Sequence, residues 1–202
     1  KLPLIAEPGT KWSYSISLDL LGRVIEVASG MDFEAFLKTR IFEPLKMNIS
    51  YFQVPKSETP RLVSNYAPVN GVLFPIDPAA TSIYLDKPAF AFGGAGVVCS
   101  ARDYDRFLNM LANYGELDGV RIMSPKTAAL AMSDLLPPAV STDGTFAAGA
   151  GFGAGGRVGK GANEGVYGWG GAAGTVAFVD PKRKLRAICM AQYMPSNVYP
   201  FH

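Results

Sequence analysis

Histidine is nearly absent from this sequence: the single histidine, His202, is the last residue. Catalytic sites of the serine–histidine or cysteine–histidine type need a histidine inside the fold, and histidine is also the commonest protein ligand of transition metals. The sequence therefore excludes a histidine-based nucleophilic site and a histidine-rich metal site in this stretch of chain. We predict no metal and no cofactor, and any acyl chemistry must use another base.

Cysteine, net charge and long apolar runs are also scarce. Cys99 and Cys189 lack metal-ligand spacing and lie among apolar neighbours, so we expect buried free thiols, with a disulfide as the alternative. The net charge of +2 is too small to imply a nucleic-acid partner. No apolar run approaches the ~20 residues of a membrane span. With 49% hydrophobic residues, the composition suits a well-packed enzyme.

The sequence does contain a tyrosine, Tyr14, placed between a turn and a helix. Pro8-Gly9 is a turn dipeptide. Apolar spacing predicts a helix over 17–29, with Ser17 as its N-cap and Gly30 as its left-handed end. The apolar face of this helix consists of Leu18, Leu21, Ile25 and Ala28. Taken alone, Tyr14 is a structural loop residue, but without an interior histidine it is also the best general base available.

Glycine is abundant near the end of the chain. Residues 151–156 match the pattern GxGxxG, but no helix is predicted after them, so a bent strand explains them better than a dinucleotide site. Gly168-Trp169-Gly170-Gly171-Ala172 lies on a predicted strand. Its glycines either form a structural bulge or let a substrate approach the backbone, where an N–H can stabilise an oxyanion.

The remaining pattern predicts helices first and antiparallel strands last. Helices are expected from Asp32 to before Pro44, from Ser100 towards Gly115, and from Ser124, where Ser100 pairs with Asp103 in a capping box. Residues 50–92 form a long loop with two short strands near 62–66 and 72–74. Strands are expected at 149–158, 164–172, 174–180 and 185–193. We treat 1–202 as one domain, mostly helix and loop over 1–145 and antiparallel strands over 146–202.

Two stretches carry a family resemblance. Pro-Gly-Thr-x-Trp-x-Tyr-Ser at 8–15, followed by Leu-Leu-Gly-x-x-Ile-Glu-x-x-Ser-Gly at 20–30, resembles the second catalytic motif of the serine β-lactamase-related family. Residues 41–47, Ile-Phe-Glu-Pro-Leu-Lys-Met, resemble another sequence motif of the same family. The family includes class C β-lactamases, DD-peptidases and esterases. The resemblance implies an α+β fold of the β-lactamase/transpeptidase type, with helices on an antiparallel sheet.

The resemblance also implies roles for individual residues. Tyr14 would act as general base. Trp169-Gly170-Gly171 occupies the place of the third motif, so these residues would bind substrate, with Trp169 shaping the acyl or alcohol pocket. The backbone N–H of Ala172 would contribute to the oxyanion hole. Residues 50–92 would border the pocket.

The first motif of the family, Ser-x-x-Lys at a helix start, does not occur in the sequence. In the family it precedes the tyrosine motif, so we expect it before Lys1, together with any targeting signal. The chain is thus expected to be the C-terminal portion of a longer protein and to be inactive without its partner, the missing N-terminal portion.

Two departures from the β-lactamase pattern indicate the substrate. Tyr14-Ser15-Ile16 stands where β-lactamases have Tyr-x-Asn, and Trp169 replaces a lysine that helps to bind the β-lactam carboxylate. We therefore expect a serine hydrolase that cleaves small-molecule carboxylic esters through an acyl-enzyme. The alternatives are an acyltransferase or a β-lactamase/DD-peptidase on the same fold, or a ligand-binding relative without catalysis.

Overall fold

The computed structural model describes residues 3–14 and 16–198, so Ser15 and His202 lie outside the described chain. Its principal helices are α1 (Ser17–Ser29), α2 (Phe33–Leu37), α3 (Ala101–Ala112) and α4 (Pro125–Ala131). A turn of π-helix, Lys38–Phe42, continues α2 and ends before Pro44. Short 3-10 turns cover Lys56–Arg61, Ala79–Thr81, Ile83–Leu85 and Gly161–Asn163. Within the described residues, no helix is both long enough and apolar enough to cross a bilayer.

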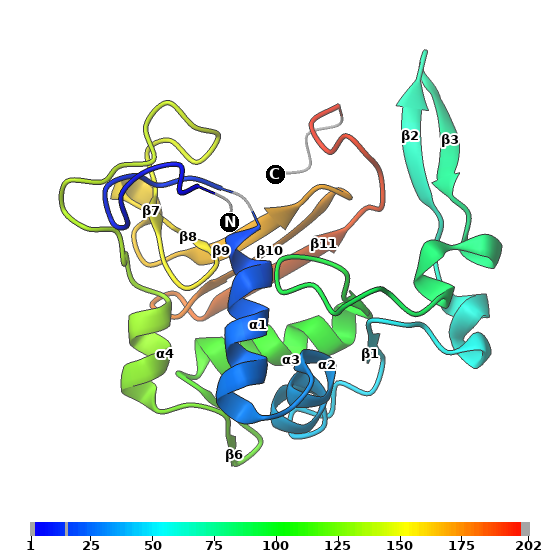
Figure 1. Ribbon diagram of the computed structural model, residues 1–202, viewed down its shortest axis with the longest axis horizontal. Coiled ribbons are helices and arrows are strands. Elements are labelled where there is room, and N and C mark those ends of the chain that lie inside the picture. Colours follow the sequence, from blue (N-terminus) through cyan, green and yellow to red (C-terminus); the bar gives the residue numbers. More distant parts are fainter. Residues whose placement is uncertain (1–2, 15, 199–202) are drawn as a thin grey trace.

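The largest sheet is built from the C-terminal part of the chain and lies behind α1 in Figure 1. Its strand order is β11-β10-β9-β8-β7, and every neighbouring pair is antiparallel. The strands are β7 (Gly151–Phe152), β8 (Arg157–Val158), β9 (Tyr167–Gly171), β10 (Thr175–Asp180) and β11 (Leu185–Met190). The fold is therefore the α+β arrangement of helices and antiparallel strands predicted from the sequence.

Smaller two-stranded pairs join the helical region. The pair of β2 (Asn65–Val69) and β3 (Val72–Asp77) is a hairpin that projects from the molecule in Figure 1. Its base is tied to the end of the chain, because the Met194 N–H donates to the Tyr66 carbonyl at 2.7 Å. The other pairs are β1 (Ser50–Tyr51) with β4 (Val98–Cys99), and β5 (Glu116–Leu117) with β6 (Val120–Arg121).

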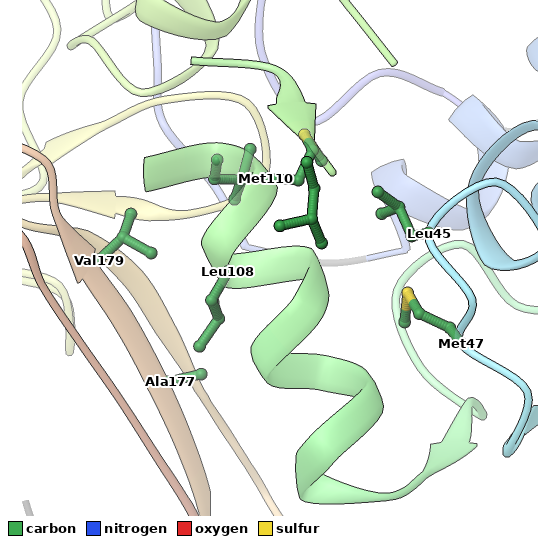
Figure 2. Close-up of a cluster of buried hydrophobic side chains, with 8 residues drawn as sticks. Leu45, Met47, Leu108, Met110, Ala177 and Val179 are labelled. Atoms are coloured by element: carbon green, nitrogen blue, oxygen red, sulfur yellow. The ribbon is translucent and has the colours of Figure 1, made fainter. Parts of the chain in front are cut away.

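The core lies where α3 meets the sheet. Figure 2 shows Leu108 of α3 facing Ala177 and Val179 of β10, and Met110 on the opposite side of the helix, towards Leu45 and Met47. Leu45, Met110 and Val179 are completely inaccessible to solvent. Burial of such side chains contributes about 1.5–3 kcal/mol each. Through these contacts on its two sides, α3 joins the sheet to the N-terminal helical region.

Several sequence predictions of local structure are confirmed. The Ser124 side chain accepts a hydrogen bond from the Thr127 N–H as an N-cap, and Gly30 ends α1 with a φ of 69°. The Ser100 hydroxyl accepts from the Asp103 N–H, but Asp103 does not complete the predicted capping box. Its carboxylate instead accepts from the Ile49 N–H at 2.6 Å and from the Ser50 hydroxyl at 3.1 Å, which joins α3 to β1.

Other predictions of local structure are wrong. The N-cap of α1 is Ile16, without a side-chain hydrogen bond, so Ser17 does not cap the helix as predicted. The predicted strand over 149–158 is a hairpin, β7–β8, because the glycines between its strands permit a tight turn in which the Gly153 N–H donates to the Gly156 carbonyl at 2.8 Å. The two cysteines are free, as predicted, but they are only partly buried.

Candidate active site

Tyr14 lies between a turn at residues 7–10 and helix α1. The Thr10 N–H donates to the Glu7 carbonyl at 3.1 Å across Pro8-Gly9, and Gly9 has a φ of 78°. Proline and a left-handed glycine at these central positions are the residues that a type II turn requires. The Tyr14 side chain is 49% exposed. A half-exposed tyrosine next to a defined turn is accessible to a substrate.

A glycine-rich loop, residues 92–96, fixes the first turn of α1. The Gly94 N–H donates to the Asp19 carboxylate at 3.0 Å, although the two residues are 75 positions apart. At Gly93, an added Cβ would lie 2.0 Å from the Leu18 carbonyl oxygen. Only glycine allows two backbones to approach this closely, so the loop holds the start of the helix directly after the tyrosine motif.

Tyr14 and Trp169, which belong to the two predicted motifs, lie in contact. Their rings stack with centroids 5.5 Å apart and an interplanar angle of 27°. Phe146 contacts both rings, at 5.2 Å and 5.8 Å, and Phe152 lies 5.4 Å from Trp169. Trp12 lies 5.3 Å from Phe152 and 5.8 Å from Phe146. We call these five residues the aromatic cluster. Offset and edge-to-face pairs at such distances are each worth about 0.5–1.5 kcal/mol beyond simple burial.

The strand that carries Trp169 is only partly paired. β10 covers one edge of β9 along its whole length, whereas β8 reaches only Tyr167 and Gly168 on the other edge. Within the described chain, the second edge of Trp169-Gly170-Gly171 therefore faces no strand. An open strand edge next to glycines can accept an extended ligand through backbone hydrogen bonds.

Ala172 begins the turn between β9 and β10 and is exposed. The turn is anchored, because the Gly174 N–H donates to the Gly171 carbonyl at 3.2 Å and the Tyr193 N–H donates to the Ala173 carbonyl at 3.0 Å. The Ala172 N–H has no hydrogen-bond acceptor among the residues that the structure describes. A backbone N–H without an acceptor in the described chain, three residues after Trp169, can stabilise a developing negative charge.

The glycine-rich residues 151–156 pack on the ring of Tyr167. This ring lies beneath the β7–β8 turn, where a Cβ on Gly156 would be 2.7 Å from it. The Tyr167 hydroxyl donates to the Ala154 carbonyl at 2.6 Å. Burial raises the pKa of Tyr167 to about 12. No helix follows the motif, since β8 does. The arrangement agrees with the prediction that 151–156 is not a dinucleotide site.

The charged groups nearest to β7 hold the fold. The Asp134 carboxylate accepts from the Phe152 N–H at 3.0 Å and pairs with Lys160 at 3.1 Å. Burial works to raise the pKa of Asp134, but the hydrogen bonds from Phe152 and Lys160 outweigh it and the pKa is lowered.

The Cys99 thiol is unsuited to nucleophilic attack, because burial raises its pKa to about 11. Within the aromatic cluster, Tyr14 is the only titratable side chain.

The structure brings the predicted residues Tyr14 and Trp169 together, beside two rings that the sequence did not single out, Phe146 and Phe152. Phe146 lies in an irregular loop, where no periodicity marks a residue as functional. Phe152 was assigned to a strand whose turn was not recognised. Only the abundance of aromatic residues around the two motifs could have indicated these rings.

Comparisons with known proteins identify the family of the chain. The Beta-lactamase family model matches residues 1–201. The lovastatin esterase of Penicillium rubens is 31% identical over 212 residues, which span 91% of this chain and 51% of the esterase. The chain thus spans about half the length of the curated relatives that it matches.

Two solved structures share the fold. A simvastatin synthase variant from Aspergillus terreus superposes with a TM-score of 0.85 at 23% identity, over 98% of this chain and 55% of the synthase. EstCE1, a hydrolase with promiscuous acyltransferase activity, has a TM-score of 0.81 at 26% identity, over 96% of this chain and 54% of its own. Because the family model matches almost the whole chain, the chain belongs to the beta-lactamase family.

Proposed function

We propose that the protein containing this chain hydrolyses carboxylic esters through an acyl-enzyme, with Tyr14 as general base. The observation that carries the proposal is the stacking of Tyr14 on Trp169 at 5.5 Å. It joins the only titratable group of the cluster to a strand whose glycines and open edge can receive a substrate. The relatives that include an esterase support the same reaction class.

The proposed reaction uses a serine and a lysine that this chain does not supply. The serine oxygen bonds to the ester carbonyl carbon while the phenolate of Tyr14 takes the serine proton. The lysine cation stabilises that phenolate. The negative charge on the carbonyl oxygen is stabilised by the Ala172 N–H. The bond to the alcohol oxygen then breaks and Tyr14 returns the proton to that oxygen. Water then attacks the acyl carbon while Tyr14 takes one of its protons. The bond to the serine oxygen breaks, Tyr14 returns the proton to the serine, and the acid is released.

The exposed surface of α1 is suited to bind the segment that carries the serine. Its apolar side chains are largely exposed: Leu20, Leu21, Val24 and Val27 are 50–71% accessible. Phe90, Phe92 and one side of α1 line a groove of about 370 Å³. An exposed apolar patch of this kind marks a contact surface. We propose that the upstream portion with Ser-x-x-Lys packs here, and that the 202-residue chain alone is inactive.

The test is Tyr14→Phe in the full-length protein, assayed on p-nitrophenyl butyrate. Loss of a general base is expected to lower kcat by about 10²–10⁴-fold. The matched control is Tyr114→Phe, which removes the hydroxyl of another exposed tyrosine outside the aromatic cluster. The base assignment is wrong if Tyr14→Phe retains activity within a few-fold of the control.

The second candidate is an acyltransferase, which passes the acyl group to an alcohol in place of water. The likeness to a synthase fold and to a hydrolase with promiscuous acyltransferase activity favours it. Both reactions share the same acyl-enzyme, so the test is competition. If an added alcohol increases total ester consumption and appears as a new ester, transfer is the main reaction. If free acid stays the product at all alcohol concentrations, hydrolysis is.

A further inference from the structure

Phe146 is an exposed aromatic residue at the centre of the aromatic cluster. Its side chain is 63% accessible, and its ring meets Tyr14 edge-to-face with centroids 5.2 Å apart and an interplanar angle of 89°. It also contacts Trp169 and Trp12, each at 5.8 Å. These ring contacts hold Phe146 in place, yet most of its side-chain surface stays open to solvent and is available to a ligand.

The backbone around Phe146 is held on both sides. The buried Thr142 hydroxyl donates to the Ala150 carbonyl at 2.8 Å and closes the loop. On one side of Phe146, the Ala147 N–H donates to the Thr145 hydroxyl at 3.1 Å. The Phe146 carbonyl itself accepts from the Arg157 guanidinium of β8 at 2.8 Å. The loop therefore presents the ring at a defined position.

The contact with Tyr14 indicates which part of a substrate Phe146 meets. A general base that gives its proton to the leaving alcohol must lie within hydrogen-bond reach of the alcohol oxygen, about 2.6–3.2 Å. The group attached to that oxygen then passes close to the Tyr14 ring. Phe146 stands against this ring and is open to solvent, so it can cover an apolar alcohol group and withdraw its surface from water.

We propose that Phe146 is a specificity-determining residue that favours esters, and acceptor alcohols, with a bulky apolar alcohol portion. This inference rests on the proposed function, because it requires Tyr14 to act at the alcohol oxygen. It goes beyond that function by naming the substrate feature that the site selects.

The test compares benzyl butyrate with ethyl butyrate in a pH-stat assay of the full-length protein. The two substrates share the acyl group and differ in the alcohol. Phe146→Ala is expected to lower the benzyl-to-ethyl ratio of kcat/KM roughly tenfold, the discrimination that a lost apolar contact provides, mainly through KM. Phe146→Leu, which keeps apolar volume, should give an intermediate ratio. Phe178→Ala, which removes a phenyl ring on β10 outside the cluster, should leave the ratio unchanged.

The outcomes separate the inference from the function on which it rests. A fall in the ratio for Phe146→Ala, with the order expected for Phe146→Leu, supports the inference. An equal loss of activity on both esters, or an unchanged ratio, overturns it while leaving the ester hydrolase intact. Absence of turnover of either ester by the wild-type protein overturns both proposals.

Discussion

The contact between residues 92–96 and α1 makes Gly93 and Gly94 a sharp pair of test sites. Neither glycine has a left-handed φ, so alanine fits the backbone at both. A Cβ on Gly93 would lie 2.0 Å from the Leu18 carbonyl oxygen and 2.8 Å from its carbon, whereas a Cβ on Gly94 would lie 3.5 Å from the Leu18 side chain. Gly93→Ala therefore pushes the loop off the helix, and Gly94→Ala does not.

The expected loss of stability in Gly93→Ala follows from how closely the added Cβ would approach the Leu18 carbonyl. Leu18 belongs to the first turn of α1, so the backbones must separate by roughly 1.4 Å to restore ordinary contact at 3.4 Å. Overpacking costs about 1–3 kcal/mol, occasionally more, and a clash with backbone belongs at the upper end. For Gly94→Ala, reduced entropy of the unfolded chain should stabilise by about 0.4–1 kcal/mol.

The assay is urea unfolding of the two variants beside the wild-type protein, followed by activity well below the transition. We expect Gly93→Ala to lose about 2–3 kcal/mol relative to Gly94→Ala. We also expect it to lose activity, because the loop packs on the start of α1, which follows Tyr14 in the chain. Equal midpoints for the two variants would refute the close packing of the loop on the helix. Normal stability with lost activity in Gly94→Ala would refute its use as a neutral control.

Two further predictions concern β9. A Cβ on Gly168 would lie 2.2 Å from the Ala177 carbonyl oxygen, whereas one on Gly170 meets only an ordinary contact at 3.5 Å. Gly170→Ala should therefore unfold like the wild-type protein but lose about tenfold in kcat/KM if substrate lies against the strand. Gly168→Ala should unfold at a lower temperature in a thermal melt. Full activity in Gly170→Ala would contradict the role of that glycine. Tyr167→Phe removes the hydrogen bond to the Ala154 carbonyl and should cost about 0.5–1.5 kcal/mol. Burial raises the pKa of Tyr167 to about 12, so its contribution to stability is complete below the unfolded pKa near 10 and is lost as the pH rises through 12. The free energy of unfolding should therefore depend less on pH in this range for Tyr167→Phe than for the wild-type protein. An identical pH dependence would show that Tyr167 is not the group that titrates.

The sequence by itself determined the local elements and the two motifs. The Ser124 N-cap, the left-handed Gly30 and the last hairpin follow from interactions within a few residues, which pattern reasoning captures. Tyr14 and Trp169 were identified from their neighbours along the chain. The excess of glycine at 151–156 was recognised as structural, although its turn was not.

The tertiary structure decided what lies beside these motifs. Asp103 does not complete the predicted capping box, because its carboxylate accepts from the Ile49 N–H, 54 positions earlier in the sequence. Phe146 contacts Tyr14 from a loop 132 positions away. Such contacts depend on how helices pack on the sheet, so no local period encodes them. The sequence predicts Tyr14 as the base and the strand of Trp169 as part of the candidate site. The packing of distant segments placed those two side by side and supplied the exposed ring that we expect to select the alcohol.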